Sequence, residues 1–201
     1  MVVDFCAGAG GKTLALGAMM RSTGRLYAFD TSERRLANLK PRLARSGLSN
    51  VHPVWIDSEN DPKIKRLAGK IDRVLVDAPC SGLGTIRRNP DLKWRQTPQE
   101  IKKLGQTQLA ILESASRLVK PGGRLVYATC SFLEQENQGL VDLFLEKHPE
   151  FEVLPAAEAL GQHFLHDGIP LGSSNTKPWW QVWPHIHGTD GFFGAVLRRK
   201  P

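Results

Sequence analysis

With 201 residues, the chain is long enough for one domain with a substantial hydrophobic core, and its hydrophobic share of 41% is ordinary for a globular protein. No apolar run approaches the roughly 20 residues that a membrane span needs, and the N-terminus does not resemble a signal peptide. Three widely spaced cysteines do not form a disulfide framework, so we expect reduced thiols and a cytoplasmic protein. The net charge of +7 favours a polyanionic partner, although solubility alone would also account for it.

The N-terminal segment predicts a strand, a glycine-rich turn and a helix. Residues 1–6 form the strand, residues 7–11 the turn, and Lys12 opens the helix. Glycine lets the backbone approach a ligand that the N–H groups of the helix face, which is typical of a cofactor cradle. Cys6 stands where a P-loop needs glycine, and Thr13 stands where a dinucleotide fingerprint needs its third glycine. The turn therefore predicts a different cofactor, and a simple tight turn is the alternative.

Aspartate residues stand at the ends of four successive predicted strands, at Asp4, Asp30, Asp57 and Asp77. One such acid is explained by a helix cap or a turn, but four in succession favour a shared pocket. An acid at the tip of the second strand can accept both ribose hydroxyls of a nucleoside. Strands that alternate with helices, such as the one predicted from about residue 32 to 46, indicate a parallel, doubly wound sheet.

Two predicted strands end in a cysteine. The apolar run 74–76 is followed by Asp77, Pro79 and Cys80, and the strand 124–129 is followed by Cys130. Open α/β sheets place their chemistry at the carboxyl ends of the strands, so these tips and the glycine turn predict one pocket.

The loop after Cys80 carries a mixture of charge and aromatic surface. Its cations are Arg87, Arg88, Lys93 and Arg95, and Trp94 lies among them. This mixture suits phosphate contacts and base stacking, whereas a solvated charged loop is the plainer interpretation. Its position beside Cys80 favours RNA binding.

The C-terminal half predicts a helix from residue 97 to about 119, stopped by residues 121–123, and a second helix from about 133 to 147. A short strand follows near residues 151–154, and strands at 181–183 and 192–198 look antiparallel at the sheet edge. Between them, residues 155–180 read as a long irregular loop. It holds His163 and His166, which we interpret as exposed or structural because the cysteines are too scattered to complete a zinc site.

Together, four segments resemble one known family: residues 4–13, 77–82, 128–131 and 189–193. The Pro-Cys and Thr-Cys strand tips are the most specific feature. Over essentially its whole length the chain is similar to the Sun-family (RsmB-like) RNA cytosine-5 methyltransferases. This resemblance implies a Rossmann-like α/β fold, the seven-stranded S-adenosylmethionine methyltransferase sheet, mostly parallel with an antiparallel edge hairpin and helices on both faces.

The resemblance implies that S-adenosylmethionine is the cofactor. Asp30 would hold its ribose, Asp57 would lie near its adenine, and Asp77 would face both the cofactor and the target base. The remaining residues that would line the cofactor site are Cys6, Ala7, Gly8, Gly10, Gly11, Lys12 and Arg35.

By the same resemblance, Cys130 would be the nucleophile and Cys80 the thiol that helps release the product, with Asp77 and Lys12 beside them. Carbon 5 of cytosine is too weak a nucleophile to take a methyl group unaided. A thiolate that adds to carbon 6 makes carbon 5 enamine-like, and cysteine suits this role because its thiolate is both a strong nucleophile and a tolerable leaving group. Asp77 can hydrogen-bond the base edge, and the reaction needs no metal.

Two features depart from the family. Alanine stands where the family usually has proline before its glycine pair, which should leave the cradle intact. The chain also begins inside the first strand, so we expect a single catalytic domain over residues 1–201 without the N-terminal elements usual in the family.

Two other functional classes stay open at this point. One is a cofactor- or RNA-binding fragment without activity, and the other is a P-loop nucleotide hydrolase, which Cys6 disfavours. The two retained thiols favour chemistry. We expect ribosomal RNA as the substrate, with transfer RNA as the alternative, and we expect a monomer without membrane or metal partners.

Overall fold

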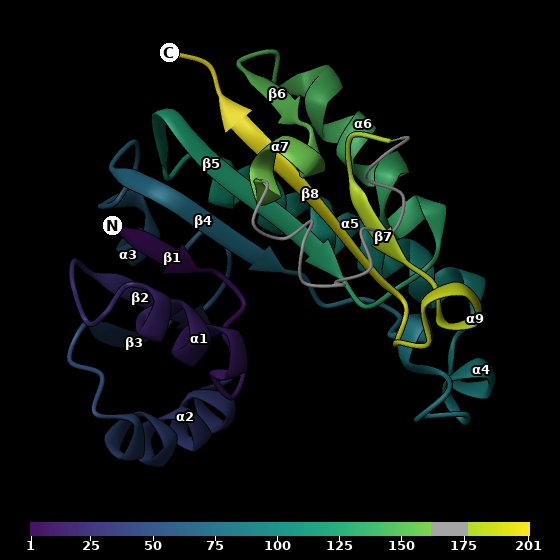
Figure 1. Cartoon of the computed structure of the whole chain (residues 1–201), viewed down its shortest axis with the longest axis horizontal. Helices are drawn as coiled ribbons and strands as arrows, with labels where there is room; N and C mark the ends of the chain where they lie inside the picture. The colour runs from purple at the N-terminus through teal and green to yellow at the C-terminus, as the bar shows by residue number, and fades with distance from the viewer. Residues whose placement is uncertain (162–176) are drawn as a thin grey trace.

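The computed structural model describes residues 1–161 and 177–201 as an α/β fold built on one sheet (Figure 1). The strands are β1 Val2–Asp4, β2 Leu26–Asp30, β3 Val51–Trp55, β4 Ile71–Asp77, β5 Val119–Thr129, β6 Phe151–Leu154, β7 Trp180–Val182 and β8 Phe192–Arg199. The α-helices are α1 Gly11–Met19, α2 Glu33–Ser46, α3 Pro62–Lys65, α4 Leu92–Arg95, α5 Pro98–Ser116, α6 Gln138–Lys147, α7 Ala156–Leu160 and α9 Pro184–His187. Two 3₁₀ turns, η1 Leu83–Thr85 and η2 Glu134–Glu136, complete the described elements.

The sheet follows the order β3-β2-β1-β4-β5-β8-β6, and β7 pairs beside this path with β8. Strands β1 to β5 pair in parallel, whereas β8 runs antiparallel to β5. The short strands β6 and β7 share the outer edge of β8: β6 pairs with residues 196–199 and β7 with residues 192–194. The predicted parallel sheet with an antiparallel edge is confirmed, with β7 as an eighth strand.

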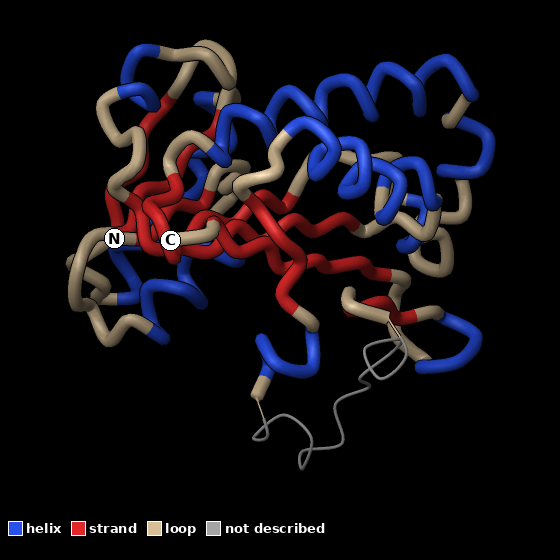
Figure 2. The backbone as a smooth tube through the Cα atoms, turned by 90° about the horizontal axis from the view of Figure 1, so that it is seen from above, coloured by secondary structure: helices blue, strands red, loops and turns tan. Residues whose placement is uncertain are grey.

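Alternation along the strands explains why helices cover both sides of the sheet (Figure 2). In β2, Leu26 and Ala28 belong to a core cluster that includes Leu36 and Leu39 of α2, while Phe29 belongs to the other cluster. Successive side chains of a strand point to opposite faces, so a strand that is apolar at consecutive positions must be covered on both. The larger cluster joins β4 and β5 to buried residues of α5 and α6, including Leu112.

Helix ends are set by local hydrogen bonds where the sequence predicts them. The Ser32 side chain accepts a hydrogen bond from the backbone N–H of Arg35 at the start of α2, and Gly47 adopts a left-handed conformation after its end. Thr97 and Glu100 form a reciprocal capping box at the start of α5. Both motifs satisfy N–H or C=O groups that the first and last helical turns leave unpaired.

Four predicted segments differ from the structure. The segment 155–180, predicted as an irregular loop, contains helix α7 in its described part, at Ala156–Leu160. Helix α5 ends at Ser116, because Val119 already pairs with Ile71 of β4, and residues 121–123 belong to β5 at a point where the strand register shifts. The helix predicted from residue 133 is divided into η2 and α6 by Asn137, whose backbone is not helical. The loop after Cys80 contains η1 and α4.

In the described part of the chain, no helix has the length and apolar character to cross a bilayer. His163 and His166, for which the sequence predicts exposed or structural roles, lie outside the described residues.

Candidate active site

The predicted strand tips meet around a cavity of about 850 Å³ at the carboxyl ends of β1, β2, β4 and β5. Its wall contains most of the predicted cofactor and catalytic residues: Cys6, Ala7, Gly8, Gly11, Lys12, Asp30, Arg35, Asp77, Cys80 and Cys130. The volume lies within the range of about 300–1,000 Å³ that is usual for small-molecule sites. The glycine turn and the tips of β4 and β5, which were predicted to form one pocket, therefore line one cavity.

Asp30 organises the glycine turn. Its carboxylate is almost fully buried and accepts hydrogen bonds from the backbone N–H of Gly8 at 2.8 Å and of Ser32 at 2.7 Å. The guanidinium of Arg35 lies 3.6 Å from the same carboxylate. These contacts fix the acid at the cavity wall and leave lone pairs that can accept ligand hydroxyls.

Gly10 supports the turn from behind, outside the set of residues that line the cavity. It has a φ of +86°, and a Cβ at this position would lie 2.1 Å from Cδ1 of Leu39. A side chain here would clash with α2 and strain the backbone, so this glycine sets how closely the turn approaches the helix.

Asp57, which the resemblance predicts to lie near the adenine, is not among the residues that line the cavity. Its side chain is exposed, and the wall at this point contains Ile56 and Glu59. Strand β3 ends at Trp55, and the buried Ile56 that follows lines the cavity in place of the acid. Ile111 also lines the cavity. The sequence analysis identified neither Glu59 nor Ile111, because neither residue directly follows a strand.

Lys12 and Asp77 connect the glycine turn to the tip of β4. The lysine Nζ lies 2.6 Å from Oδ2 of Asp77 and 5.5 Å from the ring centroid of Phe192. Behind them, Thr13 donates a hydrogen bond to Asp4 at 2.7 Å. Burial raises the pKa of Asp4 to about 6, and its Oδ1 is a buried atom without a hydrogen-bond partner.

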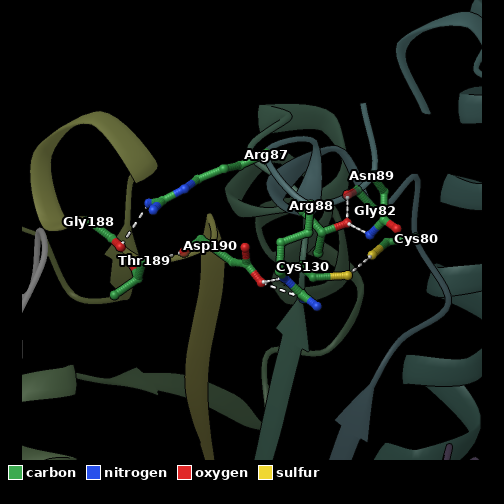
Figure 3. A network of polar contacts seen from close by, with 10 residues as sticks. Cys80, Gly82, Arg87, Arg88, Asn89, Cys130, Gly188, Thr189 and Asp190 are labelled. Atoms are coloured by element: carbon green, nitrogen blue, oxygen red, sulfur yellow. Dashed lines mark hydrogen bonds and ion pairs between the residues drawn. The ribbon is translucent and has the colours of Figure 1, made fainter. Parts of the chain in front are cut away.

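The two thiols face each other, with 3.4 Å between the Sγ atoms of Cys80 and Cys130 (Figure 3). The hydrogen bond with the Cys80 thiol and, to a smaller extent, the charge of Lys12 lower the pKa of Cys130 to about 7, against the opposing effects of burial and of the Asp77 charge. The same contact, together with burial, raises the pKa of Cys80. The pair therefore favours the thiolate on Cys130.

Cys6 lines the same cavity, but its surroundings give it a different character. Burial and the negative charge of Asp4 raise the pKa of its thiol. A thiol that stays protonated is a poor nucleophile, so Cys6 is suited to lining the cofactor cavity.

The loop with the predicted RNA-binding cations lies against the tip of β5. Gly84 donates its N–H to the carbonyl of Cys130, and Gly191 donates to the carbonyl of Gly84, both at 2.8 Å. Figure 3 shows Arg88 reaching Asp190 beside Cys130, with hydrogen bonds of 2.8 and 2.5 Å. The loop is thus tied to the segment that precedes β8.

The other cations of this loop make weaker or more local contacts. Arg87 donates to the carbonyl of Gly188 at 3.1 Å, and Arg95 at the end of α4 pairs with Asp91, which directly precedes that helix. Lys93 lies 4.9 Å from the ring centroid of Trp94, whose side chain is 80% exposed. Of the four cations, Arg88 therefore lies beside Cys130, and the ring of Trp94 is left open to solvent.

Among the residues that the structure describes, no group of three or more His, Cys, Asp or Glu side chains is arranged to hold a metal ion.

Comparison with known proteins gives consistent results. Residues 1–198 match the family described as "16S rRNA methyltransferase RsmB/F". The "Probable ribosomal RNA small subunit methyltransferase B" of Synechocystis sp. is 38% identical over 200 residues, which are 98% of this chain and 43% of the relative. The chain spans less than half the length of the curated relatives that it matches.

Solved structures agree with this result. The crystal structure of PH0851 superposes with a TM-score of 0.87 at 40% identity, covering 98% of this chain and 42% of the other. NSun6 from Pyrococcus horikoshii, crystallised with SFG, gives a TM-score of 0.82 at 30% identity, covering all of this chain and 48% of the other. The fold, the paired thiols and these likenesses together lead to one conclusion: the chain belongs to the RsmB/F family of S-adenosylmethionine-dependent ribosomal RNA methyltransferases.

Proposed function

We propose that this chain transfers a methyl group from S-adenosylmethionine to carbon 5 of a cytosine in RNA, through a covalent bond to Cys130. Ribosomal RNA is the proposed substrate, with transfer RNA as the alternative, and the site of action is then the cytoplasm. The observation that carries the proposal is the pair of thiols 3.4 Å apart at the tips of two adjacent strands, one of them with a pKa lowered to about 7. The family assignment leaves the P-loop hydrolase interpretation without support.

The volume of the cavity and the polar groups in its wall suit S-adenosylmethionine. Asp30 presents a buried carboxylate to the cavity at the position that suits ribose hydroxyls, and the glycine turn allows backbone approach. The cavity runs from this turn to Asp77 and the two thiols. When bound, the cofactor supplies the methyl group that carbon 5 accepts.

The Cys130 thiolate would form a bond to carbon 6 of the cytosine while N3 takes up a proton. Lys12 and Asp77, joined by their ion pair, lie beside the thiols and would bind the polar edge of the base, so we assign the proton supply near N3 to this pair. With carbon 5 now enamine-like, the methyl group can be accepted there. Cys130 thus acts as a nucleophile that activates the base covalently.

Release of the methylated base breaks the bond between carbon 6 and Cys130. Carbon 5 loses its proton to water from the solvent, the electron pair of that bond restores the double bond between carbons 5 and 6 and expels Cys130 as the thiolate, and N3 returns its proton, which restores the aromatic ring. Cys80 lies close enough to Cys130 to help this step, and its raised pKa keeps it protonated while Cys130 attacks. Unequal acidity in the pair therefore separates the two roles.

Replacing Asp30 with Ala should weaken S-adenosylmethionine binding. Charge-assisted hydrogen bonds are worth about 1.5–3 kcal/mol each, so the loss of the ribose acceptor should raise Kd by about tenfold or more. Isothermal titration calorimetry measures this, with circular dichroism confirming the fold, and Asp142→Ala on the exposed face of α6 serves as the control for lost charge. An unchanged Kd in a folded Asp30 variant would remove this residue from the site.

Neutralising Lys93 and Arg95 should lower RNA affinity and flatten its salt dependence. For single-stranded RNA the log–log slope should fall by about 0.7 for each phosphate contact that is lost. Fluorescence anisotropy over a range of salt concentrations gives the slope. A matched double variant at Lys40 and Arg45, two exposed cations of α2, should keep the original slope. If both double variants behave alike, the loop is an ordinary solvated surface.

The alkylation rate of Cys130 should rise with pH around a midpoint near 7, because only the thiolate reacts and the pKa of Cys130 is lowered to about 7. In Cys80→Ala the hydrogen-bond donor is gone, so the midpoint should move up toward the ordinary cysteine pKa of about 8.5. Iodoacetamide labelling with mass-spectrometric assignment of the modified cysteine measures both. A midpoint that is identical in the two proteins would contradict the assigned role of Cys80 as donor.

Cys130→Ala should abolish both methyl transfer and the covalent RNA adduct, whereas Cys80→Ala should still form the adduct and resolve it slowly. The measurements are transfer of tritium from labelled S-adenosylmethionine to unmodified ribosomal RNA and a denaturing gel of the protein with labelled RNA. A stable band should accumulate in Cys80→Ala and vanish in the double variant. An adduct in Cys130→Ala but not in Cys80→Ala would reverse the two roles. An active enzyme that gives no adduct in any variant would contradict the covalent mechanism.

A further inference from the structure

A fully buried carboxylate lies directly behind the thiol pair. Glu136, at the end of η2, accepts hydrogen bonds from the backbone N–H of Ser81 at 2.8 Å, from the Ser81 hydroxyl at 2.5 Å and from the Ser131 hydroxyl at 2.5 Å. The side-chain amide of Gln108, on α5, donates a fourth bond at 3.0 Å. The sequence analysis did not identify Glu136, because it follows no strand and belongs to no recognised motif.

The donors to this carboxylate are the residues that follow the two cysteines. Ser81 comes directly after Cys80, and Ser131 comes directly after Cys130, so a single side chain holds both strand tips. The two serine hydroxyls lie 3.2 Å from each other. Gln108 adds to the bridge, because its amide also donates to the carbonyl of Pro79 at 2.9 Å.

Hydrogen bonds from every second residue at the end of β5 and just beyond it hold Glu136 and its neighbour Asn137 in place. The Tyr127 hydroxyl donates to the backbone carbonyl of Glu136 at 2.7 Å, and the Thr129 hydroxyl donates to the Asn137 side chain at 2.6 Å. The Asn137 amide then donates to the carbonyl of Ser131 at 3.1 Å. Residues two apart share one face of a strand, so residues 136 and 137 are held along that face.

Burying a carboxylate is costly unless hydrogen bonds compensate for its lost hydration. Here four donors do so, and three of them belong to the two cysteine tips. An apolar side chain could fill the same space but would fix no distance between the tips. The network therefore constrains the geometry of the thiol pair in addition to packing it.

We propose that Glu136 is a positioning residue that sets the separation of Cys80 and Cys130. The inference rests on the proposed two-thiol reaction, in which one cytosine must be within reach of both sulfur atoms. By holding Ser81 and Ser131, the carboxylate keeps the adjacent thiols in contact before any substrate binds.

The test measures the thiol separation without RNA or cofactor. Diamide takes two electrons and two protons from the thiols of Cys80 and Cys130, becoming a hydrazine while a disulfide forms between them. Disulfide formation, followed by mass spectrometry, is compared with iodoacetamide alkylation of the same thiols. Misplacement by about 1 Å can cost up to about a hundredfold in rate, so Glu136→Ala should slow disulfide formation at least tenfold relative to alkylation. The ratio of the two rates separates geometry from thiol acidity.

Conservative variants show which property of Glu136 matters. Gln has the same length, and its amide can accept from the backbone of Ser81 and donate to both hydroxyls, so Glu136→Gln should stay near the wild-type ratio. Asp is one methylene shorter and cannot reach both tips, so Glu136→Asp should fall toward Glu136→Ala. If Glu136→Ala fails to fold, the Gln and Asp pair decides. Equal ratios in those two variants would overturn the proposal.

Asn50→Ala provides a matched control for lost stability. Asn50 is buried and donates to the carbonyl of Thr23 at 3.1 Å, far from the cysteine tips in the chain and outside the cavity wall. Its variant should keep the wild-type ratio of disulfide formation to alkylation. A loss in Asn50→Ala as large as in Glu136→Ala, or an unchanged ratio in Glu136→Ala, would overturn the inference.

Methyl transfer gives an independent readout. Glu136→Ala should lower kcat while KM for S-adenosylmethionine stays unchanged, because Glu136 does not line the cofactor cavity. A rise in KM with an unchanged kcat would contradict a positioning role. If the wild-type protein does not methylate RNA at all, the proposed function fails, while the disulfide measurement still decides the role of Glu136 in thiol geometry.

Discussion

The parallel pairing of β4 with β5 is the constraint on which the site depends. Val76 lies opposite Tyr127 and Asp77 opposite Ala128, and the pairing continues when Ala78 donates its N–H to the carbonyl of Ala128. The two chains therefore leave the sheet side by side, and the thiols that follow come into contact. A slip of one residue would turn every buried side chain of one strand to the other face, so the hydrophobic core also fixes the chemistry.

Around this pair, each further element supplies one property. The glycine turn and Asp30 form the cofactor end of the cavity, and Lys12 reaches across from the turn to Asp77. The buried carboxylate of Glu136 holds the two tips, while the loop after Cys80 is tied through Arg88 to Asp190 beside Cys130. The site is thus held from several directions by segments that are far apart in the sequence, which suits a reaction that needs two thiols at one base.

Much of this arrangement could be predicted from the sequence, because apolar strands that end in Asp30, Asp77, Cys80 and Cys130 must place those residues at one edge of a parallel sheet. The end of α5 could not be predicted, because proline and glycine at residues 121–123 are compatible both with a helix stop and with a strand of irregular register. Only the pairing of Val119 with Ile71 shows that the strand has already begun. Asp57 is absent from the cavity wall, because a position after a strand end does not by itself decide whether a side chain faces the cavity. Glu136 escaped notice because its role depends entirely on tertiary contacts with two distant loops.

Strand β8 lies between β5 and β6, inside the sheet, although it is the last strand of the chain. Its pairing with β5 joins residues that are far apart in sequence, and such contacts form late because a long loop must close first. During synthesis, β5 therefore keeps an open edge until β8 has left the ribosome. The segment that carries Asp190 directly precedes β8, so the contact of Asp190 with Arg88 beside Cys130 forms only when β8 joins the sheet. Assembly of the sheet and completion of the site are in this way one late folding event.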